Sequence, residues 1–432
     1  MIWTHSVVLK LFMLLFMLTI MRAPNLNCKE LNKKILHVSL TKYGRLKPMD
    51  ASNFSAKAPG TLVPIAGQPD ARVAFVPHAL PPAWRWPEGL YRLLIEARIA
   101  LAALDGTGKH LPDSTILIHP LQAREAQLSS RLEGTITDPH QQILFQADPA
   151  QPTSPVDAPY REVYNYRRAL RLRLDGTNQL PLSLRLIRQL HALLLDGVRS
   201  ADPHPGEFRT IQNQIDRPAR FVPAPPESLP EILAEFESFL HDSTINFDPL
   251  VKSFLAHYQF ETIHPFRDGN GRVGRLLLAL TIAEWCSLSG QWLYMSPYFE
   301  KNRSRYIDLL FGVSTGADWE SWIQFCLEGV VAQSLDAQTR CDRLLALHRD
   351  FHARLAKLKR GSIRLSKLID GFFEKPVISV GHHQREGRIS YPTARADLQK
   401  LEKIGILQEL SGMDYITYYC REIYDITYDD VV

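Results

Sequence analysis

The stretch HPFRDGNGRVGR, residues 264–275, constrains the fold of this 432-residue chain more than any other segment. It packs one histidine, one acid, three glycines and three arginines into twelve positions, so it cannot bury itself. The segments on either side, residues 250–260 and 273–285, are strongly apolar and have helical spacing. We therefore expect a polar loop that leads into the N-terminus of a buried helix.

That position is typical of an anion-binding loop. The N-terminal end of a helix carries unpaired N–H groups and the positive end of the helix dipole. Gly269, Gly271 and Gly274 let the backbone adopt left-handed angles and approach a ligand closely. The run Asp-Gly-Asn-Gly at residues 268–271 is therefore a candidate nest for a phosphate group.

The side chains of the loop suggest a nucleotide site. Arg272 and Arg275 share one face of the expected helix and could clamp the outer phosphates. Asp268 is the only acid in the loop and the natural Mg²⁺ ligand, because Mg²⁺ on a nucleotide needs only one or two carboxylates. His264 could take a proton from an attacking hydroxyl. Asp-Gly-Asn-Gly alone is usually a turn and a lone histidine before proline is usually structural, but their combination favours function.

These residues match every fixed position of the Fic family signature, His-x-Phe-x-[Asp/Glu]-Gly-Asn-Gly-Arg-x-x-Arg, so the chain resembles that family. The resemblance extends over about residues 70–345 and includes segments similar to the family's N-terminal arm, flap hairpin and adenine-pocket segment. It implies a mainly α fold, with a Fic-type helical core, a β-hairpin flap and a C-terminal winged helix-turn-helix domain.

The resemblance also implies a reaction. Most members of the family transfer AMP from ATP to a Ser, Thr or Tyr hydroxyl of a protein and release pyrophosphate. The target would be an unknown protein, possibly the chain itself. Carried over, His264 is the general base, Asp268 holds Mg²⁺, and Asn270 with Gly271 stabilises charge on the α-phosphate. The implied ATP site comprises Glu133, Arg220, Phe221, Asp268, Gly269, Asn270, Gly271, Arg272, Gly274, Arg275, Asn302 and Tyr306.

Within this set the resemblance implies separate tasks. Arg272 and Arg275 would hold the β- and γ-phosphates. Arg220 and Phe221 in the flap would align the target segment by strand addition. Asn302 and Tyr306 are candidates for the nucleoside end.

A second short pattern indicates regulation. Residues 129–134, SSRLEG, fit the family's inhibitory pattern [Ser/Thr]-x-x-x-Glu-[Gly/Asn], with Ser129, Glu133 and Gly134 at its fixed positions. By itself the pattern is more typical of a helix end with a glycine cap. In a chain with the full loop motif, we expect Glu133 to pair with Arg275, so that the γ-phosphate loses its partner and the enzyme is autoinhibited.

The remaining chain divides into regions by composition and periodicity. We expect an apolar and Lys-rich extension at 1–48, a Pro-rich arm and helix at 49–113, a Fic core at 114–345, and a linker helix with a winged-helix domain at 346–432. Apolar spacing predicts helices at about 91–103, 114–132, 161–171, 181–195, 227–241, 249–262, 272–287, 301–313 and 318–357, with a strand-like interruption at 209–226. From residue 363, three helices followed by strands are expected.

The C-terminal region leaves two roles open. Arg388, Arg395, Lys400 and Lys403 could face DNA phosphates, but neighbouring acids dilute the patch, and a winged helix used for packing or for a homodimer explains it equally well. An ATP-sensing DNA-binding regulator is therefore the main alternative to an enzyme. Removal of AMP, or transfer of another nucleotidyl group, is a third possibility within the same fold.

Composition bounds the setting. The chain is 45% hydrophobic and 22% charged with a net charge of +4, which does not favour wholesale nucleic-acid binding. Scattered cysteines in odd number indicate a reducing, cytoplasmic environment; they are Cys28, Cys286, Cys326, Cys341 and Cys420. The apolar run at 11–21 is too short to span a bilayer, which needs about 20 residues. Residues 1–48 fit a start at Met49, a membrane-associated helix or a disordered extension.

Overall fold

The computed structural model describes residues 48–65, 72–109, 114–138, 141–142, 145, 157–172, 180–198, 204–215, 221–358, 363–410 and 415–431. The chain divides into two units, residues 1–48 and residues 49–432. The expectations for the extension before Pro48, and the flap position Arg220, lie outside the described residues. The described helices and strands all belong to the second unit.

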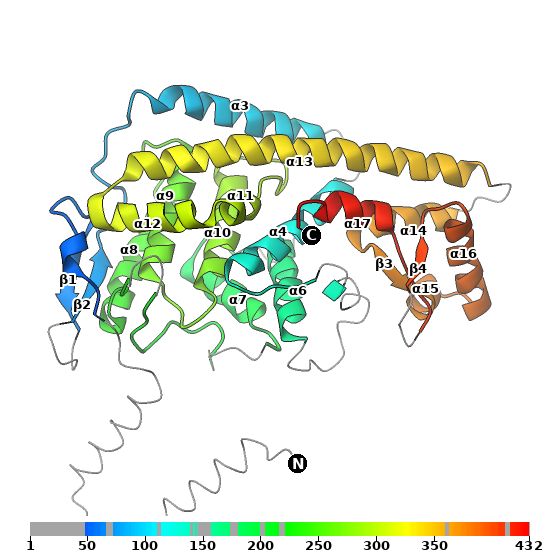
Figure 1. The fold of residues 1–432 in the computed structure, drawn as a ribbon, viewed down its shortest axis with the longest axis horizontal. Coiled ribbons are helices and arrows are strands. Elements are labelled where there is room, and N and C mark those ends of the chain that lie inside the picture. The colour runs from blue at the N-terminus through cyan, green and yellow to red at the C-terminus, as the bar shows by residue number, and fades with distance from the viewer. Residues whose placement is uncertain are drawn as a thin grey trace, which may run out of the picture. The chain divides into compact units, whose positions relative to one another are not determined.

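This second unit is mainly helical, as the sequence predicted (Figure 1). The predicted helices are present, with ends within a few residues of those expected from apolar spacing. The helices of the first part are α3 (Leu90–Lys109), α4 (Thr115–Leu132), α6 (Ala158–Arg171), α7 (Leu184–Leu194), α8 (Leu229–His241), α9 (Pro249–Ile263), α10 (Asn270–Trp285), α11 (Ser296–Lys301), α12 (Arg303–Gly316) and α13 (Trp319–Ala356).

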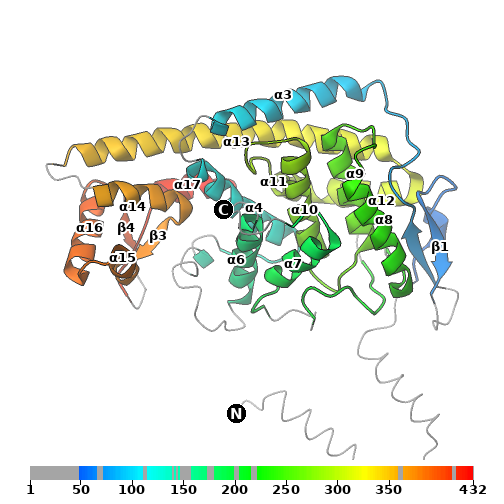
Figure 2. The same cartoon turned by 180° about the vertical axis from the view of Figure 1, so that it is seen from behind.

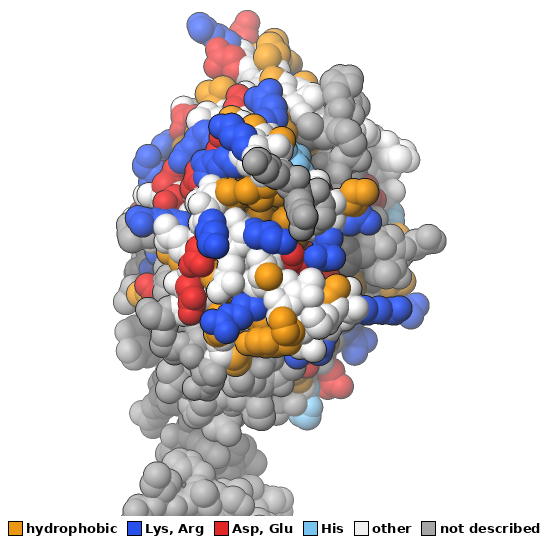
Figure 3. Space-filling model, turned by 90° about the vertical axis from the view of Figure 1, so that its right-hand side faces the viewer, with side chains coloured by type: hydrophobic (Ala, Val, Ile, Leu, Met, Phe, Trp, Pro, Cys, Tyr) orange, Lys and Arg blue, Asp and Glu red, His pale blue; other side chains and the backbone are white. Residues whose placement is uncertain are grey.

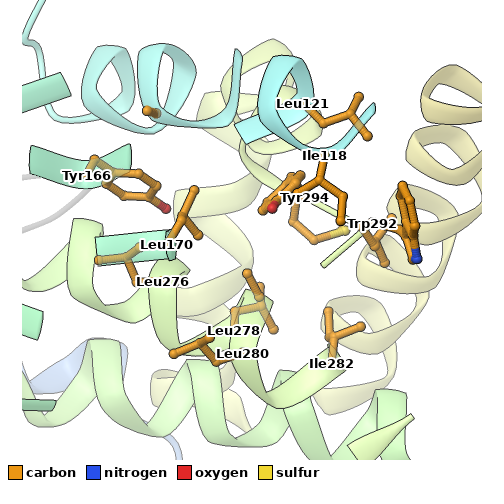
Figure 4. Packing of buried hydrophobic residues seen from close by; sticks show 14 of the residues in the cluster. Ile118, Leu121, Tyr166, Leu170, Leu276, Leu278, Leu280, Ile282, Trp292 and Tyr294 are labelled. Carbon is orange, nitrogen blue, oxygen red and sulfur yellow. The ribbon is translucent and has the colours of Figure 1, made fainter. Parts of the chain in front are cut away.

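Helix α10 lies in the centre of the core. Its apolar residues Leu276, Leu277, Leu278, Leu280 and Ile282 are all buried, because α4, α6, α7 and α9 pack around it (Figure 4). Burial of each such side chain contributes about 1.5–3 kcal/mol. The prediction of a helix buried all round is therefore confirmed, and the loop before α10 is anchored to a rigid element.

The N-terminal arm is more regular than the sequence indicated. We expected an extended, proline-punctuated segment, but β1 (Gly60–Pro64) and β2 (Val73–Pro77) form an antiparallel hairpin in which Gly60 pairs with Pro77. Prolines stand at strand ends, where a missing N–H costs no ladder bond. Phe75 of β2 packs against Phe221 with ring centroids 5.6 Å apart, which joins the arm to the flap segment.

One long helix connects the core to the C-terminal region. Helix α13 has 38 residues, which at 1.5 Å per residue span about 57 Å. Helix α3 packs along it, and both views of the ribbon show the pair side by side (Figures 1 and 2). Asp318 caps its first turn by accepting the Ser321 N–H at 3.2 Å.

The C-terminal region contains helices and a small sheet. Its elements are α14 (Ile363–Glu374), β3 (Val377–Ser379), α15 (Val380–Gly387), α16 (Tyr391–Lys403), β4 (Gln408–Leu410), β5 (Thr417–Tyr419) and α17 (Arg421–Tyr428). The sheet is antiparallel in the order β3-β5-β4.

The expectation of a closing strand run was only partly right. Residues 417–419 form β5, but the chain then turns into α17. The buried residues Ile423, Ile426 and Thr427 are three and four positions apart, so they share one helical face. That face is buried in the unit, where α17 packs on α4. Among the described residues, no helix is long and apolar enough to cross a membrane.

Candidate active site

The polar loop begins at a residue with an unusual backbone. Helix α9 ends at Ile263, and His264 caps it with φ 51° and ψ 59°, in the left-handed region that non-glycine residues rarely occupy. Its N–H still donates to the Phe260 carbonyl at 3.0 Å. Gly269, with φ 78°, turns the chain into α10, which begins at Asn270. A strained residue of this kind persists only where its surroundings fix it.

Hydrogen bonds from three side chains fix the loop. The Asn270 amide spans it, because Oδ1 accepts the Phe266 N–H at 2.8 Å and Nδ2 donates to the Phe266 carbonyl at 2.8 Å. Asn213 donates to the same carbonyl at 2.8 Å, and Arg209 Nε donates to the His264 carbonyl at 2.8 Å. The Asn270 side chain is thus used within the loop.

The ring of His191 supports the loop from α7. It stacks on Phe266 at 3.8 Å between ring centroids, and its Nε2 lies 3.0 Å from the Asp268 carbonyl oxygen. No local pattern in the sequence marked His191, because it lies 73 positions before His264 on a separate helix. Arg209 and Asn213 lay in the flap-like segment, but only the structure shows that they brace the loop.

The ring of His264 is oriented as a base. Its Nδ1 lies 3.2 Å from the Glu261 carbonyl oxygen, which can only accept, so the hydrogen of the neutral ring is on Nδ1. Its Nε2 is then left with a free lone pair. Burial, with the charge of Arg209, lowers the pKa of His264 to about 4. The imidazole is therefore neutral at pH 7 and able to accept a proton.

His264 opens into a cavity of about 360 Å³. Among the expected site residues, the cavity brings together Glu133, Phe221, His264, Gly271, Arg275 and Tyr306. Its apolar wall comes from α12 and includes Ile307, Leu310 and Phe311. Asp268, Arg272 and Asn302 are described but do not line it, and the Asn302 amide donates instead to the Tyr298 carbonyl at 2.9 Å.

Three hydrogen bonds hold the side chain of Arg275. It is buried, its Nε donates to Ser129 Oγ at 2.8 Å, and its Nη2 donates to the Ser129 carbonyl at 2.9 Å and to Glu133 Oε1 at 2.8 Å. The expected pairing of Glu133 with Arg275 is therefore present. Burial raises the pKa of Glu133, but Arg275 and Arg272 outweigh it and keep that pKa below its usual value.

Glycines make this contact possible. A Cβ on Gly271 would lie 2.1 Å from Glu133 Oε1, so the carboxylate can approach α10 only because residue 271 has no side chain. Gly134 follows with φ 89° and ends the turn after α4, as expected for a glycine cap.

Arg272 has a different set of partners. Its Nη1 lies 2.5 Å from Glu162 Oε2 on α6, and its Nη2 lies 3.4 Å from Asp268 Oδ1. Glu162, which the sequence did not single out, also accepts from Thr135 Oγ1 at 2.9 Å. The Asp268 side chain is 40% exposed and accepts the Gly269 N–H at 2.7 Å through Oδ1. One accessible carboxylate beside a phosphate nest suits Mg²⁺, which keeps waters and phosphates as its other ligands.

Two further groups act at the cavity, Glu261 in its lining and His257 behind Tyr306. The Glu261 carboxyl lines it, its Oε1 has no hydrogen-bond partner among the described residues, and burial raises its pKa to about 8. His257 fixes Tyr306: its Nδ1 lies 3.2 Å from the Gly274 carbonyl oxygen, so its Nε2 accepts the Tyr306 hydroxyl at 2.9 Å. Burial, with the charge of Arg275, lowers the pKa of His257 to about 3, which keeps it an acceptor.

Comparison with known families agrees with this geometry. Residues 181–282 match the model of the Fic/DOC family, and residues 91–175 match the model of the Fic/DOC family N-terminal region. These two regions of the chain are similar to the Fic/DOC family. The loop motif lies in the first match and Glu133 in the second, so the ion pair between Glu133 and Arg275 joins the two matched regions.

Two proteins that are similar to part of this chain have named activities. The chain is 40% identical over 101 residues to the protein adenylyltransferase fic-1 of Caenorhabditis elegans, which is 23% of this chain and 19% of that protein. It is 38% identical over 100 residues to a probable protein adenylyltransferase of Aquifex aeolicus, which is 23% of this chain and 28% of that protein. The chain thus spans only about a fifth to a quarter of these relatives.

A solved structure supports the fold. A Fic family protein from Desulfovibrio desulfuricans matches with a TM-score of 0.51 at 19% identity, over 79% of this chain and 98% of that one. At this identity the likeness concerns the fold alone.

Proposed function

We propose that the site is a protein adenylyltransferase, which transfers AMP from ATP to a Ser, Thr or Tyr hydroxyl of a target protein and releases pyrophosphate. The observation that carries this proposal is the position of a neutral histidine base and a buried arginine in one cavity, at the N-terminus of α10. The names of the relatives support it, because a protein adenylyltransferase and a probable one each match 23% of this chain.

The loop supplies a base and an anion site for this reaction. His264 Nε2 takes the proton of the target hydroxyl as its oxygen forms a bond to the α-phosphorus. The bond from that phosphorus to the pyrophosphate oxygen breaks, so one bond forms and one is lost. The unpaired backbone N–H groups at Asn270 and Gly271 stabilise the charge on the α-phosphate. Attack in line at phosphorus depends mainly on positioning and electrostatics.

The outer phosphates lie against the two arginines in this proposal. Arg272 and Arg275 hold the β- and γ-phosphates once their present carboxylate partners are displaced. When bound at Asp268, Mg²⁺ would neutralise phosphate charge. The apolar wall of α12 and the Tyr306 ring suit the nucleoside end, whereas the assignment of Asn302 rests on the sequence resemblance alone.

The flap offers a surface for the target. Phe221 lines the cavity and pairs with Ile215 through a single antiparallel bridge. An extended peptide could add to this segment and bring its hydroxyl to His264. The neighbouring Arg220 is proposed for the same task from the sequence alone.

We further propose that Glu133 restrains the enzyme. The Nε and Nη2 atoms of Arg275 already donate to two groups of Ser129 and to the Glu133 carboxylate, so a γ-phosphate would have to compete with these partners for the guanidinium. ATP would then bind with its α-phosphorus out of line, and transfer would be slow. The same carboxylate beside the α-phosphate could position water, so removal of AMP is the competing activity at this site.

Labelling with α-³²P-ATP and Mg²⁺ tests this function. We expect weak labelling of protein by the wild type, at least tenfold more with Glu133→Gly, and none with the double variant Glu133→Gly/His264→Ala. Glu133→Gln is the conservative form, and its matched control is Glu96→Gln, which breaks an exposed ion pair with Arg92 on α3. If every variant binds ATP but none transfers label, the transferase proposal fails.

For the C-terminal region, we favour a role in packing against the core over a role in DNA binding. The order of helix, strand, two helices and two strands is that of a winged helix, and this is the assignment we propose. Lys and Arg side chains on that end of the molecule are interspersed with acidic and apolar ones (Figure 3). Asp397 of α16 pairs with Arg364 at 2.6 Å and with Lys400 at 3.6 Å, which reduces the charge offered to phosphates. Helices α14 and α17 pack instead on α4.

A further inference from the structure

A second cluster of chemically active side chains lies away from the nucleotide cavity, between α13 and α14. His348 and His352 stand one helical turn apart on α13, and Asp370 faces them from α14. His348 Nε2 and His352 Nε2 lie 2.8 and 2.9 Å from the same oxygen, Oδ1 of Asp370, and 3.2 Å from each other. The proposed adenylyl transfer uses none of these groups.

Three potential ligand atoms therefore converge on one point. In a tetrahedral site with metal–ligand bonds of about 2.0–2.1 Å, ligand atoms lie about 3.3 Å apart. The observed separations differ from that value by a few tenths of an ångström, which small rotamer changes accommodate. Without a metal ion, both short contacts with Asp370 can be hydrogen bonds if both Nε2 atoms carry hydrogen. Two N–H groups then share one acceptor oxygen and face each other at 3.2 Å, which is an unfavourable arrangement.

Neighbouring groups orient the rings as metal ligands require. His352 Nδ1 lies 3.4 Å from Ser366 Oγ on α14, and this hydroxyl can accept the Nδ1–H that a metal-bound imidazole carries. The His348 ring packs edge-on against Phe373, with ring centroids 5.3 Å apart. Both histidines lie on a continuous helix, so their positions are set before any ion binds.

The ligand types select the ion. Two imidazoles and one carboxylate favour a first-row divalent transition metal, whereas Mg²⁺ and Ca²⁺ prefer oxygen ligands throughout. The three side chains are 26%, 31% and 43% exposed, so an ion can enter from solvent and waters can fill the remaining positions. We propose that His348, His352 and Asp370 form a binding site for a divalent transition metal, for which zinc is the appropriate probe.

Such an ion would link two parts of the chain. Helix α13 belongs to the core through its contact with α3, while α14 begins the C-terminal region and packs on α4. Metal binding would therefore fasten the C-terminal region to the core next to the helix that bears Glu133. Because the ion binds the folded arrangement, it should also raise the thermal stability of the chain.

The site is tested on the full chain after removal of metals with a chelator. We expect isothermal titration with ZnCl₂ to give one zinc per chain, and CoCl₂ to give visible absorption that zinc abolishes. His348→Ala, His352→Ala and Asp370→Asn should each weaken zinc binding at least tenfold. Ser366→Ala should weaken it about tenfold through the loss of ring orientation.

The matched control is His382→Ala. This histidine also forms an (i, i+4) pair on a helix, with Glu386 at 3.2 Å, but lies outside the cluster, so zinc binding should be unchanged. Asp370→Asn keeps the size of the side chain, and circular dichroism confirms its fold. Zinc bound equally by the wild type and the ligand variants, no zinc bound by the wild type, or equal competition by Mg²⁺ would each overturn the proposal.

Discussion

At the scale of single residues, burial sets the protonation of His264 and Glu261 in the cavity. Hydrogen bonds from neighbouring side chains fix the backbone of the loop. His264 holds a left-handed backbone, donates from Nδ1 and is kept neutral. Glu261 has the opposite shift, because burial raises the pKa of a carboxyl and lowers that of an imidazole. A base and a neutral acid thus stand together in one cavity at pH 7.

The pH dependence of labelling depends on the pKa of His264. A general base must be deprotonated, so activity is lost as pH falls through its pKa, which is about 4. The charge of Glu133 raises this pKa, so its removal leaves the value no higher. We therefore expect labelling by Glu133→Gly to be level from pH 6 to 8 and to decline with a midpoint near 4. Initial rates measured across this range, with circular dichroism at each pH, check this. A midpoint near 6.5 would show that His264 is solvated in the active form.

The pairing of Glu133 with Arg275 could be predicted from the sequence because the patterns that carry the two residues are local. The loop motif and the inhibitory pattern each lie within twelve positions or fewer, and together they indicated the ion pair of Glu133 with Arg275. The sequence did not identify the residues that support the loop from other segments, Arg209, His191 and Glu162. They reach the loop through tertiary packing and follow no spacing pattern of their own.

At the scale of elements, the contact between α4 and α10 is the one through which we propose that the site is restrained. Ser129 also contributes to it, since its hydroxyl and carbonyl oxygens both accept from Arg275. Ser130 is the adjacent residue and is equally buried, but its hydroxyl has no partner among the described residues. The two serines form a natural pair for comparison.

We expect Ser129→Ala to raise labelling above the wild type, though less than Glu133→Gly does. Loss of the hydroxyl leaves a buried guanidinium N–H unsatisfied at a cost of about 1–3 kcal/mol, which weakens the hold of α4 on Arg275. Ser130→Ala should leave the labelling rate unchanged. It should change the free energy of unfolding by no more than about 0.5–1 kcal/mol. Labelling rates and urea midpoints of both variants measure the difference. Equal effects of the two substitutions would contradict the assigned role of Ser129.

Elements were predictable where one period dominated. The apolar runs of α9 and α10 have helical spacing, and both helices are where it placed them. The run at 416–428 mixes periods: Ile416, Tyr418 and Cys420 alternate, whereas Ile423 and Ile426 are three apart. The packing of its second half on α4 and α13 favours a helix there. The β1–β2 hairpin was similarly hidden by its prolines.

At the scale of the whole molecule, the helical core and the C-terminal region both pack against α4. The core contacts its C-terminal end through Arg275, and the C-terminal region contacts its outer face through α14 and α17. Buried Arg124 of α4 pairs with Asp430, and with Asp336 of α13 at 3.0 Å. Arg131, two positions before Glu133, donates to the Val431 carbonyl at 2.5 Å.

Through this network we expect the C-terminal acids to affect the Glu133–Arg275 contact from a distance. Arg340 of α13 also binds the acids after α17, with 2.7 Å to Asp429 and 3.1 Å to Asp430. The double variant Asp429→Asn/Asp430→Asn would leave the buried guanidinium groups of Arg124 and Arg340 with Asp336 as their one remaining acidic partner among the described residues. The loss of charge-assisted hydrogen bonds of this kind typically costs about 1.5–3 kcal/mol each. Part of that loss would loosen α4 and release Glu133 from Arg275.

We therefore expect this double variant to label more than the wild type and less than Glu133→Gly, although it changes no residue of the cavity. The matched control is Asp425→Asn, which breaks an exposed ion pair with Arg421 on α17 and should change nothing. In the Glu133→Gly background the double variant should add no further activity, because the inhibitory contact is already absent. A lower melting temperature without any rise in labelling would show that the C-terminal acids stabilise the fold but do not act on the inhibitory helix.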